Sequence, residues 1–184
     1  MIGGWAFHGH AIVSADDKIA DAAGATPPAL RNEADWARFQ ASLDRAAVTA
    51  LGRLGHEANP NLLARNRLVL SSSARAVERR ADAWWWNPAE ASPEAALAAA
   101  APAGGIVAVP GGRRVFDLFL GLGFDEFHLA RAEKVRVPGG IPVFSRLPHI
   151  GNANDVLAAH GLTPGPAEWL DKTAHVSLTI WRRR

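Results

Sequence analysis

The chain has 184 residues, of which 48% are hydrophobic and 21% are charged, a composition typical of one globular domain. The formal net charge is only +2, so no dense basic face indicates binding to nucleic acid. Cysteine is absent, which excludes disulfides, thiolate metal sites and thiol nucleophiles. No apolar run approaches about 18 residues and no N-terminal leader is present, so we expect a cytoplasmic protein that does not enter a membrane.

The first part of the chain predicts a strand, a long loop and an amphipathic helix. Residues 5–14 predict a strand, whose nearly unbroken apolar end is typical of the middle of a sheet. Residues 15–30 contain three aspartates and two prolines and predict a loop long enough to act as a lid over a site. A helix is predicted over residues 32–45, with Asn32 as its N-cap and Trp36 on its apolar face.

The rest of the chain alternates short strands with helices and turns. Strands are predicted over residues 47–51, 67–70, 83–86, 105–109, 125–132 and 175–181. Helices are predicted over residues 92–101 and 113–120, and a loop over residues 56–64. This alternation predicts one α/β domain spanning residues 1–184, with a mostly parallel sheet to which the C-terminal strands add an antiparallel edge.

Three of the predicted strands are followed by residues suited to binding phosphates. They precede Gly52–Arg53, Ser71–Ser73 and Gly111–Arg114. Ligands of open α/β sheets bind beyond the carboxyl ends of the strands, where small residues let the backbone approach a phosphate. Helix N-termini add free N–H groups and arginines offer bidentate contacts to phosphate oxygens. Three such corners in one chain favour a nucleotide with several phosphates.

A metal site is not predicted. His8 and His10 alternate along the first strand and therefore share one of its faces. Two ligands are too few to hold an ion, and no third ligand follows from the spacing of the sequence.

The order of the motifs resembles the dihydrofolate reductase superfamily, which includes the pyrimidine reductase of the riboflavin pathway. The resemblance runs through nearly the whole chain and rests on the segments IVSADDKIA, EADWARFQ, LGRLGHE, LLARNRLVLSSS and VPGGRRVFDLFL, in that order. It implies a three-layer α/β fold with helices on both faces of a twisted sheet. It also implies NADPH as the cofactor.

The resemblance implies a role for individual residues. Asp35 matches the active-site carboxylate that holds the pterin ring and assists its protonation. The positions implied to bind substrate are Ile12, Phe39 and Arg65, of which Arg65 matches the arginine that grips the carboxylate of the folate tail. The positions implied to bind the cofactor are Ile19, Gly52, Arg53, Ser71, Ser72, Gly111, Gly112, Arg113, Arg114 and Val115.

Other readings of these residues stay open. Asp35 also fits an ordinary acid in the first turn of a helix, where the dipole favours a carboxylate, and Glu33 is a rival acid in the same turn. Ala130 stands where the family has a threonine that bonds the carboxylate. Residues 139–144 look more like the riboflavin-pathway reductase than like dihydrofolate reductase.

The resemblance therefore implies an NADPH-dependent reductase of a pterin, converting 7,8-dihydrofolate to tetrahydrofolate by hydride transfer. One alternative is the riboflavin-pathway 5-amino-6-(5-phosphoribosylamino)uracil reductase. The other is a non-catalytic NADP-binding module, which the change at Ala130 and the altered lid leave open. The expected partner is the small-molecule pterin or pyrimidine substrate, with no nucleic acid and no membrane, and the protein is expected to be a monomer or a homodimer.

Overall fold

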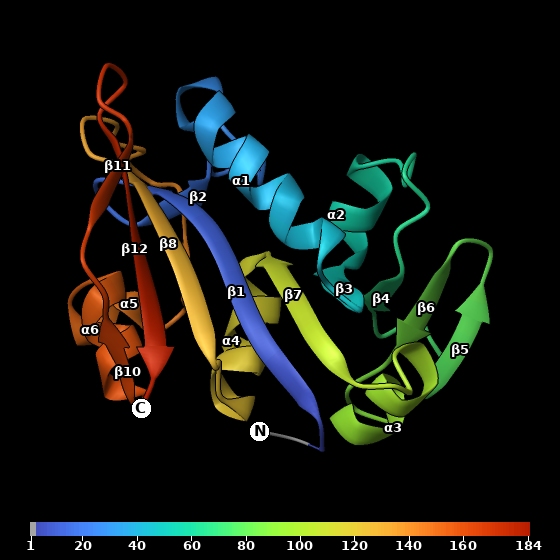
Figure 1. Cartoon of the computed structure of the whole chain (residues 1–184). Coiled ribbons are helices and arrows are strands. Elements are labelled where there is room, and N and C mark those ends of the chain that lie inside the picture. Colours follow the sequence, from blue (N-terminus) through green and yellow to red (C-terminus); the bar gives the residue numbers. More distant parts are fainter. Residues whose placement is uncertain (1–2) are drawn as a thin grey trace.

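A ten-stranded sheet runs through the computed structural model, which describes residues 3–184 (Figure 1). Its strands follow the order β10-β12-β8-β1-β7-β3-β4-β6-β5, and β11 pairs with β12. Their bounds are β1 Trp5–Ser14, β3 Val48–Gly52, β4 Arg67–Leu70, β5 Val77–Arg80, β6 Ala83–Trp86, β7 Gly105–Gly111, β8 Glu126–Ala132, β10 Leu162–Pro164, β11 Glu168–Asp171 and β12 Val176–Arg183. A second, two-stranded sheet pairs β2 (Lys18–Ala20) with β9 (Ile141–Pro142).

The pairing confirms the predicted mostly parallel sheet. Strand β1 pairs in parallel with β7 and β8, and the parallel block continues from β7 through β3 and β4 to β6. The antiparallel C-terminal edge is also confirmed, because β12 pairs antiparallel with β8, β10 and β11. The opposite edge ends in an antiparallel strand as well, since β5 runs against β6.

Helices cover both faces of this sheet, as the α/β pattern predicts. Their bounds are α1 Glu33–Asp44, α2 Arg53–Ala58, α3 Pro93–Ala100, α4 Arg113–Leu122, α5 Leu147–Ile150 and α6 Ala153–Ala159, with a 3-10 turn at Pro28–Leu30. Figure 1 shows α1 in front of the sheet and α4 behind β1 and β7. Within the described residues, no helix is both long and apolar enough to cross a membrane.

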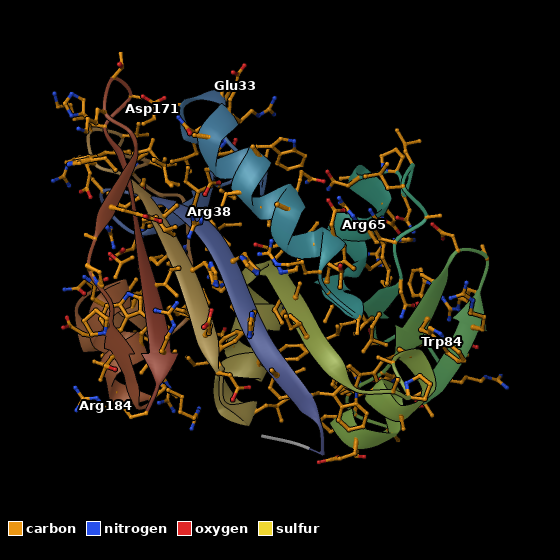
Figure 2. The ribbon with its side chains drawn as sticks, in the orientation of Figure 1. Glu33, Arg38, Arg65, Trp84, Asp171 and Arg184 are labelled. Atoms are coloured by element: carbon orange, nitrogen blue, oxygen red, sulfur yellow. The ribbon has the colours of Figure 1, made fainter. Side chains whose placement is uncertain are left out.

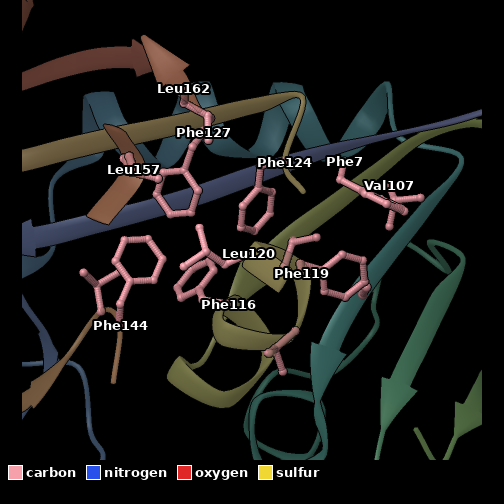
Figure 3. Packing of buried hydrophobic residues seen from close by; sticks show 14 of the residues in the cluster. Phe7, Val107, Phe116, Phe119, Leu120, Phe124, Phe127, Phe144, Leu157 and Leu162 are labelled. Atoms are coloured by element: carbon pink, nitrogen blue, oxygen red, sulfur yellow. The ribbon is translucent and has the colours of Figure 1, made fainter. Parts of the chain in front are cut away.

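The core between α4 and the sheet contains a group of buried phenylalanine rings (Figure 3). The Phe7 ring of β1 meets the Phe119 ring of α4 edge-on, with 5.2 Å between their centroids. The Phe127 ring of β8 packs at a tilt against the Phe116 ring of α4, with 5.4 Å between their centroids. A Cβ added at Gly9 would lie 2.2 Å from the Phe127 ring, so glycine is what lets this ring pack against β1. Alternate residues of β1 therefore point away from the core, toward α1.

Helix α1 is held differently from the core helices. Asn32 caps it as predicted, with its side-chain oxygen accepting hydrogen bonds from the N–H groups of Ala34 and Asp35. Only Ser42 of this helix is buried, and Trp36 on the predicted apolar face is 58% exposed. The apolar face of α1 therefore lies over an open cleft and not in the core.

Two expectations need correction. Part of the predicted loop over residues 56–64 is helical, because α2 begins directly after Gly52 at the end of β3. The predicted lid over residues 15–30 is not all loop, since it contains β2 and the 3-10 turn. Its start is anchored by Asp17, which is 7% exposed and forms an ion pair with Arg131 at 2.7 Å. Both β2 and this ion pair depend on partners far along the chain, which local sequence patterns do not reveal.

Candidate functional site

A cleft of about 2030 Å³ opens between α1, α2 and the carboxyl ends of the central parallel strands. Every residue predicted for catalysis, substrate binding or cofactor binding lines it. These residues come from segments that are far apart in the sequence, so the fold brings the predicted site together.

The strand register places the predicted phosphate-binding corners side by side. Gly52 at the end of β3 is paired with Leu70, the last residue of β4, and Ser71 and Ser72 follow directly. Along its other edge, β3 pairs with β7, and there Leu51 is paired with Gly111 at the end of β7. The carboxyl ends of the three strands thus form one continuous edge of the cleft, where open α/β sheets bind their ligands.

The N-terminus of α4 supplies the anion-binding character of this edge. Val115 and Phe116 donate their N–H groups to the Gly112 carbonyl, which leaves the first two helical N–H groups, of Arg113 and Arg114, without an acceptor in the helix. The first turn contains no acidic residue. Within the part of the chain that the structure describes, neither arginine forms an ion pair. This end of α4 therefore offers free donors and positive charge to a phosphate.

Gly112 leaves room for such a ligand. A Cβ added at this position would meet nothing within 4 Å, so the backbone is open toward the cleft. At Gly111 the opposite holds, because its φ is +99° and a Cβ would lie 2.6 Å from the Phe116 ring. Gly111 is therefore required by the fold, whereas Gly112 is a place where a ligand can approach the backbone.

Arg53 lies on the same edge and forms a solvent-exposed ion pair with Glu57. Its Nη1 donates to both carboxylate oxygens of Glu57, each at 2.9 Å, one helical turn along α2. The two side chains are 47% and 50% exposed. Exposed pairs of this kind contribute at most about 1 kcal/mol, so the guanidinium can turn to a bound phosphate at small cost.

Asp35 faces the cleft from the first turn of α1. Its N–H is bonded to the cap residue Asn32, and its carboxylate forms no ion pair among the described residues. Burial raises the pKa of Asp35 to about 6, and the positive charge of Arg38 opposes this only in part. A carboxyl group with this pKa exchanges a proton near neutral pH, as a general acid must.

The wall of the cleft below α1 contains residues that sequence reasoning did not assign to the site. Phe39 of α1 contacts His10 of β1, with 5.8 Å between ring centroids, and His128 and Leu178 also line the cleft. Burial, reinforced by the neighbouring histidines, lowers the pKa of His10 to about 3, so its ring is neutral at neutral pH. The available signal was the alternation of β1, which puts His10 on the same face as Ile12.

Arg65 lies beside the C-terminal end of α1 (Figure 2), and its donors are already engaged. Its Nη2 donates to Asp44 Oδ1 at 2.6 Å and its Nη1 donates to Gln40 Oε1 at 2.6 Å. Both partners belong to α1, and the Arg65 side chain is 17% exposed. A carboxylate on a substrate would therefore have to compete with Asp44 for this guanidinium.

The structure also places Ile19 and Ala130. Ile19 lies on β2 at the rim of the cleft. Ala130, paired with Ile12 on β1 and Leu178 on β12, is 1% exposed and brings no hydroxyl to the sheet face below α1. The family's threonine contact to the carboxylate therefore has no equivalent at this position.

Comparisons with known proteins give a fold but no close relative. No protein-family model matches the chain, and no curated protein matches it. Among solved structures, a diaminohydroxyphosphoribosylaminopyrimidine deaminase/5-amino-6-(5-phosphoribosylamino)uracil reductase from Thermotoga maritima has a TM-score of 0.67 at 18% identity. The match covers 98% of this chain and 57% of the Thermotoga chain, so this chain spans little more than half of that protein.

Two further solved structures match along their whole length. Dihydrofolate reductase from Enterococcus faecalis, in complex with NADP(H) and RAB-propyl, matches with a TM-score of 0.64 at 15% identity. The match covers 97% of this chain and 96% of the reductase chain. A candidate riboflavin biosynthesis protein from Shewanella sp. PV-4 has a TM-score of 0.61 at 16% identity, with 97% and 99% covered. The chain therefore has the fold that these proteins share.

Proposed function

We propose that this chain, which has the dihydrofolate reductase-like fold, is an NADPH-dependent reductase of a carbon–nitrogen double bond in a pterin. The first candidate substrate is 7,8-dihydrofolate, which would be reduced to tetrahydrofolate. The observation that carries the proposal is that one cleft joins an anion-binding strand edge to a carboxyl group with a pKa near 6.

The strand edge fits the phosphates of a dinucleotide. The open backbone at Gly112 and the free N–H groups of Arg113 and Arg114 suit the pyrophosphate. Arg53 and the serines after β4 lie further along the same edge, where they suit the adenine end and its 2′-phosphate. The cofactor supplies the hydride when it is bound.

Asp35 suits the proton that such a reduction requires. Reducing a carbon–nitrogen double bond adds a hydride to carbon and a proton to nitrogen. With a pKa of about 6, Asp35 is protonated in about one molecule in ten at pH 7 and in most molecules below pH 6. Its position on the cleft side of α1 would let this proton pass to a substrate bound there.

The second candidate substrate is the ribosylaminopyrimidine of the riboflavin pathway. The state of Arg65 favours it, because Asp44 and Gln40 already hold the donors that would grip a folate tail. A substrate with a phosphate on a sugar arm does not need that particular grip.

Turnover with each acceptor tests the proposal. The purified protein is mixed with NADPH and either dihydrofolate or the ribosylaminopyrimidine, and the loss of reduced nicotinamide absorbance is followed together with the mass of the product. Consumption with dihydrofolate supports the first candidate, and consumption only with the pyrimidine supports the second. If the protein binds NADPH but reduces neither compound, the proposal of a reductase is wrong and a binding module is indicated.

A further inference from the structure

Four potential metal ligands lie together on the face of the sheet that looks toward α1. His8 and His10 alternate along β1, and Glu126 and His128 alternate along β8. The two strands are parallel neighbours, as Figure 1 shows, and their register pairs His8 with Glu126 and His10 with His128. These four side chains, which we name the His–Glu cluster, therefore form a two-by-two group on one face.

The atoms of this cluster are close enough to share an ion. One nitrogen of His8, one carboxylate oxygen of Glu126 and one nitrogen of His128 all lie within 4.8 Å of one another. Ligand atoms around a tetrahedral Zn²⁺ are about 3.5 Å apart, given metal–ligand distances of about 2.1 Å. Small rotations of partly exposed side chains can close this difference. His10 is also near, with its ring centroid 4.5 Å from that of His128.

The surroundings resemble those of a metal centre in two respects. Glu126 accepts a hydrogen bond from Arg182 Nε on one oxygen, at 2.9 Å, while its other oxygen lies 3.0 Å from His128 Nε2. Arg182 can therefore orient the carboxylate from outside, as second-shell partners of metal ligands do. His10 and His128 line the cleft, so water and ions reach the cluster from the solvent.

We propose that His8, Glu126 and His128 bind a divalent transition-metal ion, with Zn²⁺ as the best match and His10 available as a fourth ligand. Two imidazoles and one carboxylate are ligands that Zn²⁺ and its first-row neighbours accept, whereas Mg²⁺ and Ca²⁺ prefer oxygen ligands alone. The positive charges of Arg38, Arg45 and Arg182 lie near the cluster and oppose a cation. This repulsion disfavours ions that are held mainly by charge, such as Mg²⁺ and Ca²⁺. Transition-metal ions, which gain affinity from nitrogen donors, are therefore preferred.

Zinc titration of the full, untagged chain tests this site. Competition with a chromophoric chelator should give one Zn²⁺ per chain. His8→Gln, Glu126→Gln and His128→Gln should each weaken binding at least about 10-fold, because loss of even a second-shell partner costs about 10–100-fold. His149→Gln is the matched control, because His149 is an exposed histidine in α5 and should leave the affinity unchanged.

Co²⁺ gives a readout that does not depend on any variant folding. In the wild-type protein it should produce the intense visible absorption of a tetrahedral site, and Zn²⁺ should abolish that absorption by displacing it. The proposal is overturned if wild-type protein gives no such absorption, or if His149→Gln loses as much zinc affinity as the three cluster variants. Far-UV circular dichroism establishes that each variant is folded before its affinity is compared.

Discussion

Removing the charge of Asp35 should stabilise the protein and inactivate it at the same time. Burial raises the pKa of this carboxyl from 3.8 to about 6, so the folded state holds its proton more tightly than the unfolded state. Stability therefore falls as pH rises from about 4 to about 6, and the full penalty is present above that range. One pKa unit corresponds to about 1.4 kcal/mol, which makes this penalty at most about 3 kcal/mol.

Asp35→Asn removes the penalty but also a favourable contact with the helix dipole. That contact is worth about 0.3–1 kcal/mol at the first turn, and partial exposure screens the penalty itself. We therefore expect the variant to be about 1–2 kcal/mol more stable than wild type at pH 8, or about 3–6 °C higher in Tm. Glu33→Gln, an exposed acid of the same turn, is the control and should lose only the dipole contribution.

Thermal and urea unfolding at pH 8 and pH 4 measure this difference. At pH 4 the carboxyl of Asp35 is neutral in the folded state and about half ionised in the unfolded state, so the advantage of asparagine should shrink to below about 1 kcal/mol. Turnover should fall at least about 100-fold in the variant, in keeping with the loss of a general acid. The wild-type rate should also decline above about pH 6, as Asp35 loses its proton. The reasoning would be refuted if Asp35→Asn were less stable than wild type at pH 8. It would also be refuted if the variant's gain in unfolding free energy were the same at pH 8 and pH 4.

Further predictions concern the cofactor and the substrate tail. Arg53→Ala should weaken NADPH binding more than NADH binding, by isothermal titration, and equal losses would contradict a contact with the 2′-phosphate. Asp44→Ala should release the Arg65 donors that Asp44 now accepts and tighten dihydrofolate binding several-fold, whereas unchanged binding would argue against Arg65 in the substrate site. Gly112→Ala should lower NADPH affinity with little change in Tm, because its Cβ meets no protein atom within 4 Å. Gly111→Ala should instead lower the Tm, because its Cβ would overlap the Phe116 ring; equal effects on Tm would argue against this division.

The parallel core and the strand-end corners were predictable because each rests on a local pattern. The apolar runs of β1, β3, β4 and β7 identify buried strands, and the small residues after them predict the edge at which open α/β sheets bind their ligands. The residues that line the cleft could be named because the resemblance adds the order of the motifs. Their roles still rest on that resemblance, because 15–18% identity to solved structures supports the fold alone.

The features that were missed depend on pairing across the fold. β9 and β2 are three residues or fewer, and each exists only because the other lies beside it. The side chains that could complete a metal site with His8 come from β8, whose register with β1 has no signature in the sequence. The engagement of Arg65 by Asp44 spans 21 positions of the chain, and only the packing of α1 brings the two together.

Transfer of deuterium from NADPH labelled at C4 of the nicotinamide tests the central claim most directly. The labelled cofactor is incubated with the wild-type protein and dihydrofolate, and with the ribosylaminopyrimidine in parallel. The account predicts that one product carries a single deuterium on carbon, and that Asp35→Asn binds the cofactor but transfers almost none. Tight binding of NADPH by the wild-type protein without label in either product would contradict it.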